Sequence, residues 1–148
     1  MSIEMNVFFR GELPDTAALT RTMQELGFPI SVVRRDYPLE GQKGFTPMLV
    51  RGKESGAELH IDEGRDAIKE IAIPERLKDI DPRFDRSVSF RFGGNWNELL
   101  CGICAATAIA KLVDGIVYEP QDGALWPLDH AIREARKMIE IVERESLA

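Results

Sequence analysis

The stretch of residues 99–113 limits the fold more than any other part of this chain, because it is apolar on nearly every side of a helix. Its apolar members are Leu99, Leu100, Ile103, Ala105, Ala106, Ala108, Ile109, Ala110, Leu112 and Val113. Asn95 can cap this helix, and Glu98 stands three residues later in the capping-box position. A helix without a polar face is largely buried in a core. It is shorter than the roughly 20 apolar residues that cross a membrane, and it contains Lys111, so we expect no membrane span.

Two strand–helix–strand units are predicted, one at each end of the chain. In the first, strands at residues 5–10 and 30–34 flank a helix that Asp15 can cap and Gly27 ends. In the second, an alternating strand at residues 87–92 precedes the buried helix, and a strand at residues 116–118 follows it. A final helix starts after Pro127, and its apolar stripe consists of Ile132, Ala135, Ile139 and Val142.

Between these units the pattern predicts a hairpin and then an irregular segment. Strands at residues 45–51 and 57–61 flank a turn at residues 52–56. Because Pro47 cannot donate a ladder hydrogen bond, we expect its strand at a sheet edge or at a bulge, and such an edge is compatible with a homodimer. Residues 63–84 are charged and broken by prolines, with short helices expected near residues 65–70 and 74–78.

The order of elements predicts an α+β fold, with a mixed sheet and helices packed mainly on one face. We expect a ferredoxin-like arrangement of the two strand–helix–strand units, followed by the C-terminal helix. The chain has 148 residues, which suits one core, and no linker divides it, so residues 1–148 are expected to form a single globular domain.

The charge balance bears on partners and location. The net charge is −6 and the pI is about 5.0, so the surface repels phosphate backbones and nucleic-acid binding is disfavoured. An acidic protein suits a basic protein partner, although acidity also serves solubility alone. The first residues lack a basic region followed by an apolar run, so we expect no signal peptide and a cytoplasmic location.

Glu58, His60 and Asp62 alternate along a predicted strand, so their side chains share one face of it. Such a set of oxygen and nitrogen donors suits a divalent cation, or acid–base catalysis. A solvated strand face carrying one histidine is the preferred interpretation. If the protein is an enzyme, these are its candidate catalytic residues.

Cys101 and Cys104 have the spacing of a redox pair. Cys101 lies beyond the first turn of its helix, where the helix dipole no longer lowers a thiol pKa, and its surroundings are apolar. We therefore prefer two small buried side chains to a dithiol centre. A zinc site joining these cysteines to His60 and His130 matches no known ligand spacing, and we predict no metal and no cofactor.

Three further residues or groups of residues near helix starts are candidates for binding. Residues 93–95 follow a strand and open a helix, a geometry that can hold an anion, but a simple turn with a cap is preferred because Glu98 adds a negative charge. Trp96 and Trp126 are the candidate interaction residues, although such tryptophans more often close the end of a core.

Several segments carry a resemblance to known proteins. They are residues 27–30, 44–48, 87–94, 98–99 with the alanine-rich helix, and 112–123. This pattern resembles small uncharacterised bacterial α/β proteins, and it is similar to proteins of toxin-immunity settings. The shared motifs are strand ends, turns and a buried helix. The resemblance therefore implies a small acidic protein that neutralises a toxin by binding it, and it carries no catalytic residues to this chain.

The favoured function is thus a non-catalytic protein-binding domain of immunity type, with a basic partner. An enzyme or metal-binding protein that uses Glu58, His60 and Asp62 is the first alternative. A dithiol protein that uses Cys101 and Cys104 is the second.

Overall fold

The computed structural model describes residues 3–147, and within them seven strands form one sheet with five helices. The strands are β1 (Ile3–Phe9), β2 (Ile30–Val32), β3 (Gly44–Val50), β4 (Lys53–Glu63), β5 (Arg86–Phe92), β6 (Ile116–Glu119) and β7 (Ala124–Trp126). The helices are α1 (Thr16–Glu25), α2 (Arg65–Ile71), α3 (Pro74–Leu77), α4 (Trp96–Val113) and α5 (Leu128–Leu147). The predicted α+β class is confirmed, and both short helices of the irregular segment are present.

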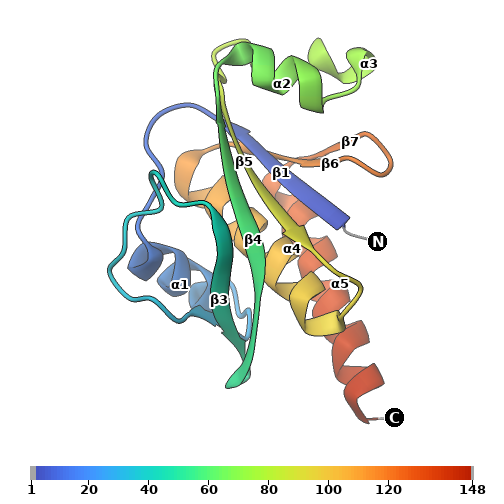
Figure 1. Cartoon of the computed structure of the whole chain (residues 1–148). Coiled ribbons are helices and arrows are strands. Elements are labelled where there is room, and N and C mark those ends of the chain that lie inside the picture. Colours follow the sequence, from blue (N-terminus) through green and yellow to red (C-terminus); the bar gives the residue numbers. More distant parts are fainter. Residues whose placement is uncertain (1–2, 148) are drawn as a thin grey trace.

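The strands lie in the order β2-β3-β4-β5-β1-β6-β7, and each neighbouring pair is antiparallel. The prediction of a mixed sheet is therefore wrong. The ferredoxin-like arrangement of two units is not confirmed either, because the sheet is larger. Strand β1 lies between β5 and β6, and three strands separate β1 from β2 (Figure 1). The parallel strands of each predicted unit are thus never neighbours.

Helices α1, α4 and α5 cover one face of the sheet, as the prediction of one helical layer required (Figure 1). Helix α4 contacts β1, β4, β5, α1 and α5, which explains why it has no polar side. It approaches β5 closely at Gly102, where an added Cβ would lie 2.1 Å from the ring of Phe92. By length and composition α4 is apolar enough to cross a membrane, but most of it is buried inside this core, as in a soluble fold.

Helices α2 and α3 cover one end of the opposite face and enclose a second, smaller cluster. Phe8 and Tyr118 stack there with ring centroids 5.4 Å apart, and Ile68, Ala72 and Ile80 pack against them. The Tyr118 hydroxyl accepts a hydrogen bond from the backbone N–H of Ile73 at 3.0 Å. This end of the sheet is therefore covered on both faces.

The hairpin of β3 and β4 turns earlier than its sequence predicted. Arg51 and Gly52 both have positive φ and form a two-residue turn, so the strand begins at Lys53 and not at Ala57. Such turns match the twist of an antiparallel pair. Gly56, predicted as part of the turn, lies inside β4 with φ at 153°.

Pro47 does not mark an edge strand, because β3 pairs with β2 on one side and β4 on the other. Strand β2 pairs only with residues 48–50, so Pro47 lies just past the end of that pairing, where its missing N–H costs no ladder bond. The edge strands are the three-residue strands β2 and β7. The N–H of Val32 donates to Thr20 Oγ1, which covers part of the β2 edge.

Arg86 joins the long loop of residues 36–43 to the sheet. Its guanidinium donates to the carboxylates of Glu40 and Glu63 and to the carbonyl of Gly11, at distances of 2.7–3.1 Å. It also lies 5.1 Å from the centre of the Phe9 ring.

Candidate functional site: the uncovered face of the sheet

The centre of the sheet has one face without a covering layer. Side chains alternate along each strand, and Met5, Val7, Phe90, Leu59 and Met48 point into the helical core. The residues between them point to the other face, beyond the end covered by α2 and α3 (Figure 1). We call this surface the open face. Its members are Glu4, Asn6, Phe45, Pro47, Leu49, Glu54, Gly56, Glu58, His60, Ser89 and Arg91.

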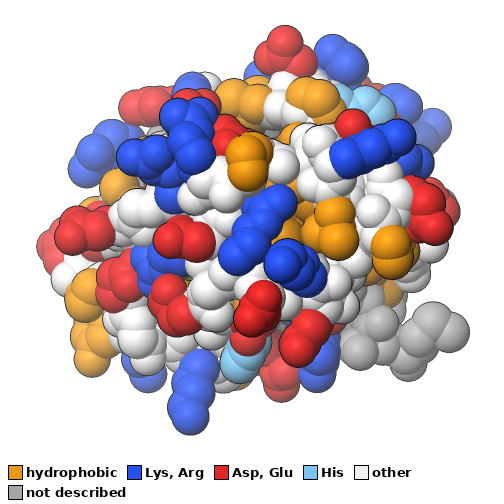
Figure 2. All heavy atoms as spheres, turned by 90° about the horizontal axis from the view of Figure 1, so that it is seen from above, with side chains coloured by type: hydrophobic (Ala, Val, Ile, Leu, Met, Phe, Trp, Pro, Cys, Tyr) orange, Lys and Arg blue, Asp and Glu red, His pale blue; other side chains and the backbone are white. Residues whose placement is uncertain are grey.

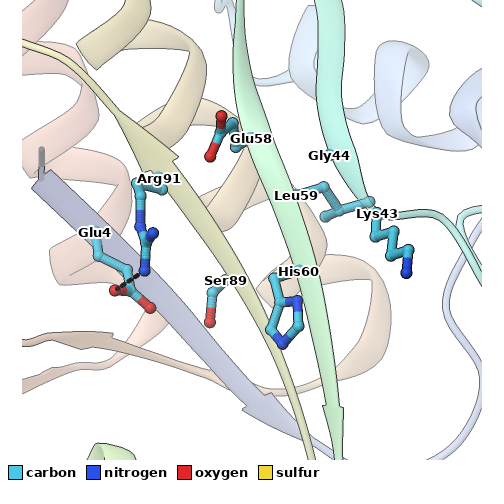
Figure 3. Close-up of a pocket in the computed structure, with 8 residues that line it drawn as sticks. All are labelled: Glu4, Lys43, Gly44, Glu58, Leu59, His60, Ser89 and Arg91. Carbon is cyan, nitrogen blue, oxygen red and sulfur yellow. Dashed lines mark ion pairs between the residues drawn. The ribbon is translucent and has the colours of Figure 1, made fainter.

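One end of the open face is a polar hollow of about 540 Å³ (Figure 3). It is lined by Glu4, Lys43, Gly44, Glu58, Leu59, His60, Ser89 and Arg91. Arg91 is directed at Glu4, with 3.8 Å between Nη2 and Oε2, and the Glu58 carboxylate lies apart from that pair (Figure 3). The polar hollow is therefore lined by both acidic and basic side chains.

The predicted sharing of one strand face by Glu58, His60 and Asp62 is present in β4. His60 Nε2 lies 3.0 Å from Asp62 Oδ1, but the imidazole is 65% exposed, and Glu58 points away from it (Figure 3). Within residues 3–145, no group of three His, Cys, Asp or Glu side chains is placed to hold a metal ion. The pair lies over solvent, where water competes with its hydrogen bond. The catalytic role of these residues stays a prediction.

A buried polar pair beneath the hollow was missed from the sequence. Ser89 Oγ donates to Asn6 Oδ1 at 2.5 Å, and Asn6 is fully buried. Among the described residues, Asn6 Nδ2 and Ser87 Oγ have no hydrogen-bond partner. In the sequence, Asn6, Ser87 and Ser89 are polar residues within otherwise apolar strands. The alternation within each strand does not show which strands are neighbours, so it could not predict that these residues lie side by side.

This row brings Ser89 opposite His60 in the β4–β5 register, next to Asp62. These three residue types are those of a nucleophilic triad, and the sequence pattern alone did not indicate this grouping. However, the Ser89 proton is donated to Asn6, and the His60 nitrogen Nε2 faces Asp62. Because an activated serine must donate its proton to the base, this arrangement does not form a nucleophile.

The other end of the open face is apolar. Phe45 is 60% exposed, and its ring lies over Gly56 of the neighbouring strand, where an added Cβ would be 2.6 Å from Cζ. Val33, Pro47 and Leu49 line a hollow of about 480 Å³ beside it. A second hollow, of about 280 Å³, joins Phe45 to Glu58 and thus connects the apolar and polar ends. The sequence offered a weak signal: an aromatic residue on the solvated side of a strand, with a glycine diagonally opposite in the neighbouring strand.

The two tryptophans differ in exposure. Trp96 is 45% exposed at the start of α4. Trp126 is partly buried against the core, and its ring lies 5.3 Å from that of His130. Trp126 thus closes the end of a core, whereas an interaction role for Trp96 stays a prediction.

Both cysteines are fully buried in α4, between the sheet and α5. Burial raises the pKa of the Cys101 thiol to about 11, although a hydrogen bond to Ser55 opposes this, and burial raises the pKa of Cys104 well above its ordinary value. Their side chains face away from His60, which lies on the open face, and His130 packs on Trp126. The structure therefore does not bring the four residues of the zinc alternative together.

The turn at Gly93, Gly94 and Asn95 is bonded to side chains of the chain itself. Asn95 Oδ1 accepts from the N–H groups of Asn97 and Glu98, so the predicted cap is confirmed. Glu98 Oε2 accepts from the N–H of Gly93 at 3.1 Å, and not from Asn95 as a capping box requires. A carboxylate of the chain thus lies where an anion would bind.

The charged side chains do not form a face of one sign at the end of the molecule that carries α2 and α3. Acidic and basic groups are interspersed there, with apolar side chains between them (Figure 2). No protein-family model matches this chain, and no curated protein matches it.

Proposed function

We propose that this protein is a non-catalytic protein-binding domain of the cytoplasm, and that the open face holds its partner. The observation that carries the proposal is the exposure of Phe45, with Val33, Pro47 and Leu49 around it, on the part of the sheet face that the described helices α2 and α3 leave uncovered. An apolar patch on an otherwise polar surface is typical of a protein interface. The adjoining polar hollow supplies hydrogen-bonding groups at its rim.

The partner that fits best is a basic protein. The chain carries a net charge of −6, which speeds the approach of a basic partner and selects against acidic ones. The same sign disfavours nucleic acid. Together with the resemblance to proteins of toxin-immunity settings, this supports neutralisation of a basic toxin by direct binding.

The test is purification of the tagged full chain from its own cells, followed by mass spectrometry of the proteins bound to it. Phe45→Gln is the test variant, and Leu112→Gln is the matched control, because Leu112 is an exposed apolar residue at the far end of α4. We expect one stoichiometric basic protein with the natural chain and the control, and at least about a tenfold lower yield with Phe45→Gln.

Thermal unfolding of both variants checks that they are folded. An equal yield of the partner with folded Phe45→Gln would remove the open face from the proposal. The lack of any stoichiometric partner, in cells that carry the candidate toxin genes, would argue against a binding domain altogether.

A further inference from the structure

We propose that Phe45, Glu54 and Glu58 form a recognition slot on the open face that takes an arginine or lysine side chain of the protein partner. The inference rests on the proposed function and names the chemistry that the partner must present. It gives a role to the exposed ring and to two carboxylates that the fold itself does not use.

The three side chains are placed by the β3–β4 pairing. Glu54, Gly56 and Glu58 alternate on β4 and therefore project from the same face. The ring of Phe45 lies over Gly56, between the two glutamates. Glu54 lines the apolar hollow together with Phe45, and Glu58 lines the second hollow together with it, so both acidic residues border the ring. A cation resting on the ring is thus within reach of an acidic group on either side.

The two carboxylates are free for a partner. Within residues 3–145, neither Glu54 nor Glu58 takes part in an ion pair. Arg91 faces Glu58 in the strand register, but its guanidinium is directed at Glu4 (Figure 3). Arg34, which shares a small hollow with Phe45, lies 5.4 Å from the centre of the Tyr37 ring. The nearby basic groups therefore leave the slot open.

The chemistry selects a basic side chain with an apolar stem. An ammonium or guanidinium is attracted to the face of an aromatic ring within about 6 Å. Its methylene groups and an apolar neighbour would cover Val33, Pro47 and Leu49, which line the hollow beside Phe45. An acidic side chain would meet two carboxylates of its own sign. A second copy of this chain would bring the same carboxylates against each other, so a foreign basic segment is the occupant that fits.

The test uses two synthetic peptides and the full chain. The probe is the blocked pentapeptide Leu-Arg-Leu-Arg-Leu, and its control is the same peptide with citrulline in place of arginine, which keeps the shape and removes the charge. Binding is measured by the shifts of backbone amide signals in NMR titrations. We expect the arginine peptide to bind at least about fivefold more tightly, with the largest shifts at Phe45, Glu54 and Glu58.

The double variant Glu54→Gln/Glu58→Gln should lose this preference, since only the charge of the slot changes. The matched control is Glu25→Gln/Glu140→Gln, which changes the net charge equally at two exposed sites on α1 and α5. It should keep the preference. Equal affinity for the two peptides, shifts centred elsewhere, a total lack of binding at millimolar peptide, or an equal loss in the control variant would each overturn the slot.

Sedimentation of the free protein tests whether a second copy of this chain, and not a foreign protein, covers the open face. A dimer that Phe45→Gln dissociates would assign the open face to a second copy and overturn the inference.

Purification from cells distinguishes failure of the recognition slot from failure of the proposed function. If the partner depends on Phe45 but is retained by Glu54→Gln/Glu58→Gln, the binding face stands and the slot fails. If no partner depends on Phe45, the proposed function itself fails.

Discussion

Arg86 holds the loop of residues 36–43 to strands β4 and β5, and its replacement tests how much this link contributes to stability. The guanidinium is only 13% exposed and bonds Glu40, Glu63 and the Gly11 carbonyl. We expect Arg86→Gln to lower the free energy of unfolding by about 2 kcal/mol, less than for a fully buried pair because both glutamates can rehydrate. Arg83→Gln is the control, since its pair with Asp81 is exposed to solvent, and it should leave stability nearly unchanged. Urea unfolding measures both.

The same network predicts a dependence on pH. The hydrogen bond from Arg86 lowers the pKa of Glu40 below its ordinary value of 4.5. A carboxylate whose pKa is lowered by folding stabilises the protein above that ordinary value and loses this effect as pH falls through the lowered one. The stability difference between the natural chain and Arg86→Gln should therefore narrow between pH 5 and about pH 3. A difference that stays constant over this range would show that Glu40 does not depend on Arg86.

Cys101 and Cys104 should be inert in the folded protein. With a pKa raised to about 11, Cys101 is ionised to about one part in a thousand at pH 8, and Cys104 is fully buried. A thiol reagent should label neither residue in native buffer and both in guanidinium chloride. Stoichiometric labelling of the native protein would restore the dithiol alternative.

At the scale of elements, the contact between α4 and β5 depends on a glycine. Gly102→Ala adds a Cβ at 2.1 Å from the Phe92 ring, so the helix must shift. We expect a loss of about 1–3 kcal/mol, although alanine favours helices by about 1 kcal/mol over glycine. Gly94→Ala, where the added Cβ meets open space, serves as the control and should be nearly neutral. A stable Gly102→Ala protein would indicate a looser packing of α4.

Local elements were predictable from the sequence, whereas their partners were not. The caps at Asp15 and Asn95 and the apolar stripes are local signals, and they predicted α1, α4 and α5. Strand order depends on contacts far apart in sequence, so nothing local indicated that β1 lies between β5 and β6. The three-residue strand β7 was missed because it is too short to show an alternation.

The part of the candidate site that depends on local alternation was predictable, whereas the part that depends on strand pairing was not. The alternation of Glu58, His60 and Asp62 is local and was found. Phe45 became a candidate only when the hairpin register placed it over Gly56, and the turn had been predicted too late in the chain for that register. The two-residue turn requires a positive φ at Arg51, which arginine rarely adopts, so the turn was hard to predict from the residue types alone.

For the whole molecule, the single continuous sheet predicts cooperative unfolding. Both hydrophobic clusters share strand β1, which contributes Met5, Val7 and Phe9 to one and Phe8 to the other. Neither cluster can therefore open fully without disturbing the other. Denaturant curves followed by far-ultraviolet circular dichroism and by tryptophan fluorescence should coincide. Two separate transitions would indicate that residues 1–148 contain more than one folding unit.

The central place of β1 has a consequence for how the protein is made in the cell. A ribosome produces β1 well before its two neighbours in the sheet, β5 and β6. During translation the apolar residues of β1 therefore stay exposed until β5 and β6 have been synthesised. This favours slow folding and makes β1 a segment that chaperones can bind. A nascent chain halted before residue 86 would hold β1 unpaired, whereas one that has passed residue 119 could complete the centre of the sheet.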